Sequence, residues 1–304
     1  MIVDRPADFL RALEAFGPPT PAPRPRGVLL VSPVRFRVSA ETARDNFYMD
    51  TDAGVDARRA QRQFDGLRRA IEGAGIPVTV FEGRAETPDD VFPNNVFATV
   101  PGRLVVGAMC HPTRRLEAER ADIRAHFTER LGYEVVDLSG RDCVAELTGS
   151  LVIDHGRRIG FCGLSHRADR AGAEAMHEAF GLALTYCFDL APEEYHTNVV
   201  LSVLAGRACV LAPSGFADPA AAEAVAAAFP ESALTLDDAE KAAFAANCIA
   251  LGPGDLFLSA TAARALAPEK RAVLERWGFR LHPVPVDEFE KAGGSLRCLV
   301  AEIF

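Results

Sequence analysis

Residues 198–213, NVVLSVLAGRACVLAP, contain a polar residue, an apolar run, a turn with Ala-Gly-Arg and a second apolar run. Two short apolar runs on either side of a glycine-containing turn predict an antiparallel pair of strands. An alanine-rich stretch with helical spacing follows at 219–229. This part of the chain therefore predicts a β-hairpin that leads into a helix.

The same pattern occurs five times, so an internal repeat is the first feature to interpret. The leading polar residues stand at positions 95, 150, 198, 247 and 295, with separations of 55, 48, 49 and 48. The first four hairpins are followed by stretches with helical spacing, at 111–131, 169–180, 219–229 and 261–277. Most of these stretches lead into a further short strand, which gives a repeating ββαβ unit.

No such unit can bury its apolar face alone, so neighbouring units must close on one another. The last unit ends at Phe304 without a second hairpin strand, and we expect residues 27–33, GVLLVSP, to supply it. The prediction is a single α/β domain over residues 1–304, with five units around a pseudo-fivefold axis. An open parallel sheet is the alternative, but its βαβ period is about 30 residues and no glycine-rich phosphate loop follows any strand here.

The composition limits the partners and the compartment. Apolar residues make up 49% of the chain and charged residues 25%, as in ordinary globular proteins. A net charge of −9 without a Lys/Arg run argues against nucleic acid. No apolar stretch approaches the ~20 residues of a membrane span and no secretory signal is visible, so we expect a cytoplasmic protein. Seven cysteines without a C-x-x-C pair disfavour both a disulfide framework and a structural zinc site.

The residues that could carry chemistry lie where the first strands begin, and in a ring these positions face one central pocket. Cys298 follows a double glycine and reads as part of a short apolar strand. Glycines permit close approach of a ligand, so this thiol is a candidate nucleophile, although free cysteines are often buried and inert. The other polar candidates are Asp89, Asp90, Asn94, Asn95, Glu146, His196 and Asn198.

These motifs, in this order over essentially the whole chain, resemble the arginine deiminase and amidinotransferase (pentein) superfamily. The resemblance implies a five-bladed α/β propeller. It also implies a catalytic set in which Cys298 is the nucleophile, His196 the acid and base, and Glu146 the carboxylate that orients the histidine. Arg167, in Ser-His-Arg, resembles an arginine that binds a substrate α-carboxylate. Asp89 and Asp90, before Val-Phe-Pro, resemble a substrate-binding motif.

Each of these residues has a structural alternative. His196 could be a core histidine and Glu146 a helix cap. Arg167 could pair with Asp169 on a surface helix. Asp89 and Asp90 could be turn formers beside a proline.

Two asparagines bear on the substrate. In this superfamily, arginine deiminases and dimethylarginine hydrolases carry an aspartate where this chain has Asn95, and deiminases carry a second one where it has Asn198. An amide both donates and accepts hydrogen bonds, which suits a neutral ureido group better than a guanidinium cation. The FPNN and YHTN motifs look most like the citrulline-utilisation hydrolase branch, whereas the segment that begins at Asn46 resembles the arginine dihydrolase branch.

The expected activity is hydrolysis of the terminal C–N bond of citrulline, or of a close ureido or guanidino analogue, giving ornithine and ammonia. The reaction would pass through a covalent Cys298 adduct without a metal or an organic cofactor. A small amino acid is the expected partner, and a homo-oligomer stays open. The alternatives are an arginine deiminase or dihydrolase, in which Asp89 or Asp90 supplies the cation site, and a non-catalytic propeller that binds another protein.

Overall fold

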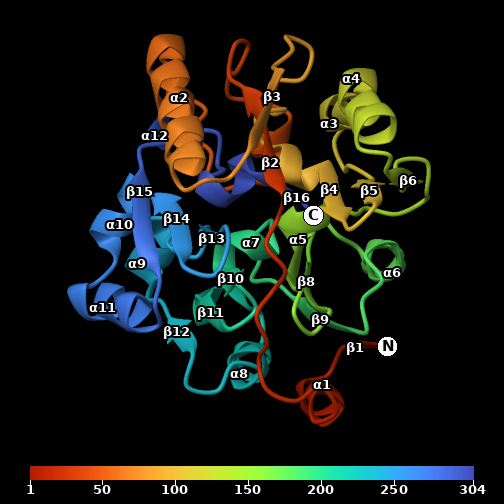
Figure 1. The fold of residues 1–304 in the computed structure, drawn as a ribbon, viewed down its shortest axis with the longest axis vertical. Coiled ribbons are helices and arrows are strands. Elements are labelled where there is room, and N and C mark those ends of the chain that lie inside the picture. Colours follow the sequence, from red (N-terminus) through yellow and green to blue (C-terminus); the bar gives the residue numbers. More distant parts are fainter.

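The computed structural model describes residues 1–304, and its strands form five separate sheets, four with three strands and one with four. Figure 1 shows the sheets around the centre of the molecule, with the longer helices at its rim. The sheets, each in spatial order, are β16 (Ala301–Ile303), β2 (Gly27–Ser32) and β3 (Val78–Glu82); β4 (Phe97–Val100), β5 (Arg103–Val106) and β6 (Glu134–Asp137); β1 (Ile2–Val3), β9 (Leu184–Asp189), β8 (Ile159–Leu164) and β7 (Leu151–Asp154); β10 (Leu201–Leu204), β11 (Ala208–Leu211) and β12 (Ala233–Thr235); and β13 (Ile249–Ala250), β14 (Asp255–Ser259) and β15 (Arg280–Val284).

Every sheet contains the same three-strand arrangement. A first strand pairs antiparallel with a second, and a third strand pairs parallel with that second strand. In one sheet the first strand is β16 from the C-terminus and the second is β2 from the N-terminal part, with Ala301 opposite Leu29. The predicted pairing of the last segment with residues 27–33 is confirmed, and one sheet holds both ends of the repeat together.

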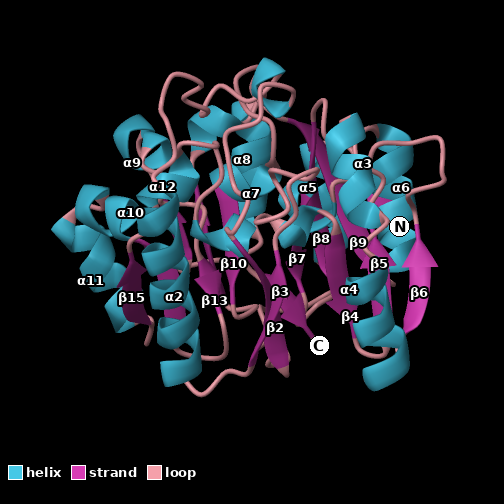
Figure 2. Cartoon of the chain, turned by 90° about the horizontal axis from the view of Figure 1, so that it is seen from above, coloured by secondary structure: helices cyan, strands magenta, loops and turns pink.

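Helices join the second strand of each sheet to the third and lie outside the strands, as Figures 1 and 2 show. In α2 the buried residues Ala60, Phe64, Leu67 and Ile71 recur at three- and four-residue spacing, which gives the helix one apolar face. None of the helices combines the length and the apolar character that crossing a bilayer requires. The helices are α1 (Pro6–Leu13), α2 (Ala57–Gly73), α3 (Pro112–Ala118), α4 (Ala121–Ala125), α6 (Arg170–Ala179), α8 (Pro219–Ala227), α9 (Asp238–Ala242), α10 (Ala260–Ala265), α11 (Pro268–Arg276) and α12 (Asp287–Glu290).

Two predicted helices are interrupted. The stretch 261–277 forms α10 and α11, which are separated at Ala267 with an extended ψ of 142°. Proline disfavours helical geometry in the residue before it, so Pro268 ends one helix and begins the next. The stretch 111–131 forms α3, α4 and a short π-helical turn at 126–130.

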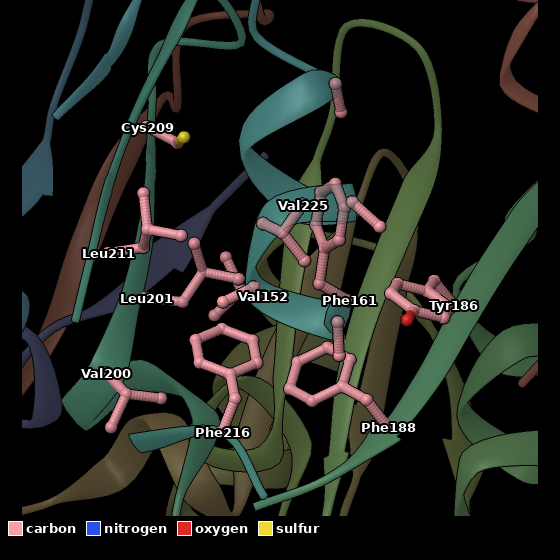
Figure 3. Packing of buried hydrophobic residues seen from close by; sticks show 14 of the residues in the cluster. Val152, Phe161, Tyr186, Phe188, Val200, Leu201, Cys209, Leu211, Phe216 and Val225 are labelled. Atoms are coloured by element: carbon pink, nitrogen blue, oxygen red, sulfur yellow. The ribbon is translucent and has the colours of Figure 1, made fainter. Parts of the chain in front are cut away.

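The apolar side chains form five clusters, and the largest has 22 buried residues. Figure 3 shows side chains of β8, β9, β10, β11 and α8 meeting in this cluster. Phe9 of α1 stacks on Tyr186 of β9 with the ring centroids 4.5 Å apart, so the N-terminal helix covers the same core.

A single helical turn precedes four of the first strands, which the sequence did not predict. These turns are η2 (Pro93–Asn95), α5 (Leu147–Ser150), α7 (Thr197–Val200) and η5 (Leu296–Leu299). The prediction that Cys298 lies within a strand is wrong, because Cys298 belongs to η5 and β16 begins only at Ala301. A short buried apolar run has no periodicity that separates a strand from a buried helical turn. The turns approach one another in the middle of the molecule and bring their polar residues together.

Candidate active site

The double glycine before Cys298 is required by two close contacts. Gly293 has a φ of +74°, and a Cβ added there would lie 2.3 Å from Nδ2 of Asn46. A Cβ on Gly294 would lie 2.6 Å from the ring of Phe92. Only glycine lets this segment pack against both neighbours, and the packing fixes the turn that carries the thiol.

Cys298 is buried, with 2% of its surface exposed, and its sulfur lies among amides. Nδ2 of Asn247 is 3.4 Å from Sγ, and Oδ1 of Asn198 is 3.7 Å from it. Burial raises the pKa of the Cys298 thiol above its usual value, although the hydrogen bond from Asn247 acts in the opposite direction. The resting group is therefore a thiol rather than a thiolate.

His196 and Glu146 form a buried pair, with Nε2 of the histidine 2.8 Å from Oε2 of the carboxylate. Burial alone would raise the pKa of Glu146, but the Arg167 guanidinium and the bond to His196 hold it well below its usual value. An ionised carboxylate only accepts hydrogen bonds, so Nε2 of His196 carries the proton in this pair.

The other ring nitrogen, Nδ1, is buried and has no hydrogen-bond partner. Burial lowers the pKa of His196, despite the opposing effect of Glu146. The imidazole is thus neutral at neutral pH, and its unpartnered Nδ1 lone pair is free to take a proton.

Gly149 lies against both His196 and Asn95. A Cβ at this position would be 2.5 Å from Oδ1 of Asn95 and 2.9 Å from Cε1 of the His196 ring. Asn95 and the histidine are therefore neighbours at the same end of the pocket, and the absent side chain at position 149 makes room for them.

We expect Gly149→Ala to lower kcat/KM by about 10²-fold, because displacing a catalytic group by about 1 Å can have an effect of that size. Steady-state kinetics on the purified variant would measure the loss. Gly140→Ala is the matched control, because nothing lies within 4 Å of a Cβ at position 140. Wild-type kinetics in Gly149→Ala would show that the ring has room to move and would contradict the close packing.

One pocket collects most of the predicted side chains. Glu146 lies behind His196 rather than in the wall of the pocket. The pocket is lined by Thr42, Asn46, Asp89, Phe92, Asn95, Arg114, Arg167, Tyr195, His196, Ala292, Gly294 and Cys298.

Arg167 reaches the pocket, but its hydrogen-bonding groups are already occupied. Its Nη1 donates to Glu146 at 3.2 Å, while Nε and Nη2 donate to Asp45 at 3.2 and 2.6 Å. Nη2 also donates to the carbonyl oxygen of Thr42. Arg167 does not pair with Asp169, and in this structure its clearest role is to hold Glu146 ionised.

Arg114 is a pocket residue that the sequence reasoning missed. Its Nε and Nη2 donate to Glu117 at 3.0 and 2.8 Å, and Nη2 also donates to the carbonyl oxygens of Asp89 and Phe92. Nη1 makes no hydrogen bond, so one edge of this buried guanidinium is available to an anion. In the sequence Arg114 reads as part of a solvated helix, and only its i, i+3 spacing from Glu117 hints at burial.

The two neighbouring aspartates have different surroundings. Asp89 lines the pocket, where Oδ2 accepts a 2.8 Å hydrogen bond from Thr42 Oγ1 and Oδ1 has no partner. Burial raises the pKa of Asp89, and Arg114 opposes that shift.

Asp90 is not in the pocket, which differs from the sequence prediction. Its Oδ2 accepts from Arg84 N at 2.8 Å and from Thr87 Oγ1 at 2.9 Å, so Asp90 is a turn-forming residue.

Two of the predicted asparagines line the pocket and one does not. Asn95 lines the pocket with its Oδ1 buried and unpartnered, and Asn46 lines it while accepting a hydrogen bond from Tyr48 N.

Asn198 lies behind the thiol, not in the pocket wall as the sequence suggested. Its Nδ2 donates to Thr148 O at 3.1 Å and its backbone oxygen accepts from Asn247. The five-fold repeat marks Asn247 as a leading polar residue, and that was the available signal for its place beside Cys298.

Comparison with known proteins gives relatives along nearly the whole chain. An N(G),N(G)-dimethylarginine dimethylaminohydrolase from Mycobacterium tuberculosis is 27% identical over 295 residues, which are 97% of this chain and 91% of that protein. The bifunctional arginine dihydrolase/ornithine cyclodeaminase ArgZ of Synechocystis is 23% identical over 246 residues, covering 81% of this chain and 33% of ArgZ.

Solved structures show the same fold. The N-terminal domain of ArgZ bound to its product superposes with a TM-score of 0.79 at 21% identity, covering 91% of this chain and 97% of that one. A dimethylarginine dimethylaminohydrolase adduct gives a TM-score of 0.70 at 18% identity, covering 91% and 99%. These likenesses confirm a mixed α/β fold of the pentein type.

A family model described as "N,N dimethylarginine dimethylhydrolase, eukaryotic" matches residues 32–304. This match confirms the superfamily predicted from the motifs and the prediction of a hydrolase that acts on non-peptide C–N bonds. The chain belongs to this dimethylarginine dimethylhydrolase family of the pentein superfamily.

Proposed function

We propose that this protein hydrolyses the terminal C–N bond of a ureido or guanidino amino acid through a covalent adduct on Cys298. One observation carries the proposal: the Cys298 thiol and a neutral His196, whose Nδ1 is unpartnered, line the same buried pocket. A binding scaffold has no need of a nucleophile and a base placed together in this way. We also infer that residues 1–304 form one five-bladed propeller, because five sheets share one strand arrangement and the first and last strands pair.

The residues account for a balanced two-step reaction on citrulline. Cys298 gives its proton to Nδ1 of His196, and the sulfur attacks the ureido carbon. The bond to the terminal nitrogen breaks, His196 protonates that nitrogen, and ammonia leaves a thiocarbamate that joins Cys298 to the ornithine nitrogen. Water then attacks the same carbon while His196 accepts its proton. The C–S bond breaks, the thiol is restored, and the released carbamate decomposes to ornithine and carbon dioxide.

Two charged residues of the pocket, Arg114 and Asp89, suit the amino-acid part of the substrate. Arg114 offers a free guanidinium edge to an α-carboxylate. Asp89 adjoins it, since its carbonyl accepts from Arg114, and its free Oδ1 can accept from an α-ammonium group. These contacts favour a free α-amino acid over a decarboxylated amine.

The reacting end favours a neutral ureido group. Asn95 lies beside His196 in the pocket, and its amide brings no negative charge. An amide can accept from a ureido nitrogen or donate to the ureido oxygen. Citrulline is therefore the first substrate we propose.

A guanidino substrate is the second candidate, and Asp89 favours it. A buried carboxylate with a free oxygen in the pocket would attract a cation, which is the role that the deiminase or dihydrolase alternative assigns to it. The names of two relatives also refer to guanidino compounds, namely dimethylarginine and arginine. Arginine or a methylated arginine would then react at Cys298 first, with release of ammonia or a methylamine.

The test is a substrate panel of citrulline, arginine, dimethylarginine and agmatine, with ammonia, amines and amino-acid products quantified. We expect ornithine and ammonia from citrulline, and little turnover of agmatine, which lacks the carboxylate. Arginine or dimethylarginine as the preferred substrate would establish the second candidate. No turnover of any member would contradict both proposed substrate classes.

Asn95→Asp tests the choice between ureido and guanidino substrates. A carboxylate only accepts, so it would mismatch the ureido oxygen at about 1–3 kcal/mol. We expect kcat/KM for citrulline to fall roughly 5- to 150-fold, while the value for arginine falls less or rises.

Asn198→Asp is the comparison for this substitution. Asn198 lies outside the pocket wall and donates to Thr148 O. An aspartate there should misplace the thiol and so lower kcat/KM for citrulline and for arginine by the same factor. An unchanged arginine-to-citrulline ratio in Asn95→Asp would remove Asn95 as the selective residue.

A further inference from the structure

Asp45, Cys110 and His111 form a cluster of three different metal-ligating groups beside the pocket. One carboxylate oxygen, the sulfur and a ring nitrogen all lie within 4.8 Å of one another. Nε2 of His111 is 3.1 and 3.2 Å from the two oxygens of Asp45. The three residues are partly exposed, so an ion from solvent can reach them.

The spacing suits a small tetrahedral ion. Zinc bonds of about 2.0–2.3 Å place neighbouring ligands roughly 3.3–3.8 Å apart. The pair formed by His111 and Asp45 is already close to that separation, and the sulfur needs only a small side-chain movement. Three protein ligands would leave the fourth position to water, as in open zinc sites.

The surroundings also support a cation. Oε1 of Glu41 lies 3.9 Å from Nδ1 of His111, on the side of the ring away from Asp45. At this distance Glu41 makes no hydrogen bond with the ring, and it adds a negative charge beside the cluster. Two cations are also near: Arg167, which pairs with Glu146 as well as with Asp45, and Arg115, which donates to the carbonyl of Cys110. Asp45, Glu41 and Glu146 together outweigh these two positive charges.

We propose that Asp45, Cys110 and His111 bind Zn²⁺ at a site distinct from the Cys298 nucleophile. The site does not depend on the proposed function. Because Asp45 lies 65 positions before Cys110, no sequence motif reveals it. Binding would draw Asp45 away from Arg167 and tie the segment that contains Thr42 and Asn46 to residues 110–111. The ion would therefore link the wall of the pocket to a neighbouring loop.

Metal binding is measured best in a Cys298→Ala background, which removes the pocket thiol. Equilibrium dialysis with Zn²⁺ should give one ion per chain, and Co²⁺ should give a sulfur-to-metal charge-transfer band. Adding Cys110→Ala or His111→Gln should weaken binding by more than about 100-fold, since even outer-shell changes weaken zinc sites by 10–100-fold. Cys110→Ala should also abolish the Co²⁺ band. Cys143→Ala is the matched control, because Cys143 is a partly exposed thiol outside the cluster, and it should bind as the parent does.

Three results would overturn the proposal. Wild-type protein that binds zinc while Cys298→Ala does not would place the ion on the catalytic thiol. Parent-like affinity in both Cys110→Ala and His111→Gln would place it elsewhere on the surface. Absence of saturable zinc binding in the Cys298→Ala protein would show that Asp45, Cys110 and His111 do not form a metal site.

Discussion

Turnover by a Cys298→Ala variant should fall by more than roughly 10⁴-fold, because no adduct can form without the sulfur. His196→Ala should lose about 10²- to 10⁴-fold, the usual range for a general acid and base. In the proposed mechanism both groups act in one proton-transfer unit, so the double variant should be no slower than Cys298→Ala alone. Single-turnover and steady-state assays on the three variants would measure these losses.

Cys143→Ala is the control for a general effect of removing a thiol, and it should keep wild-type kinetics because Cys143 lies outside the pocket. A haloacetamidine reagent should alkylate Cys298 before the other cysteines, because its planar amidine resembles the ureido and guanidino groups that we propose as substrates. Its labelling should speed up with pH, since burial raises the thiol pKa. More than about a tenth of wild-type turnover in Cys298→Ala would contradict the nucleophile assignment.

The repeat explains why so much of the fold could be predicted from sequence. Apolar runs with turn signals between them identify the hairpins, and a missing final strand identifies residues 27–33 as its replacement. Both inferences depend only on local patterns and on the need to bury each unit. The helical turn that carries Cys298 could not be predicted in the same way, because its conformation depends on the close approach of Gly293 to Asn46 and of Gly294 to Phe92.

Prediction of the site was limited by long-range contacts. Asp89 and Asp90 are adjacent in the sequence, and only the turn geometry directs one to the pocket and the other to Arg84 and Thr87. Arg114 comes from a helix whose residues look solvated until Glu117 and the carbonyls of Asp89 and Phe92 surround its guanidinium. Short motifs identify the residue types that could carry chemistry. The charged residues that pack around them, such as Arg114, can be identified only from the folded structure.

Glu146→Gln should lower kcat by about 10³- to 10⁴-fold with little change in KM, because it should reverse the His196 tautomer. Oε1 of Glu146 accepts from Cys110 N at 3.3 Å, and both oxygens lie close to Nη1 of Arg167. In a glutamine the single oxygen should stay with these donors, which leaves the amide NH₂ facing Nε2 of His196. That nitrogen must then accept, so the proton moves to Nδ1, which can no longer act as the base.

The ¹⁵N shifts of the labelled histidine distinguish this mechanism from a general structural effect. Wild type should show the proton on Nε2 and Glu146→Gln should show it on Nδ1, while amidine labelling of Cys298 confirms that the pocket still forms. Because Glu146 does not line the pocket, substrate affinity should change little. If the variant keeps the proton on Nε2 and still loses turnover, the negative charge of Glu146 matters more than the tautomer. If it keeps near wild-type turnover, His196 does not act through Nδ1.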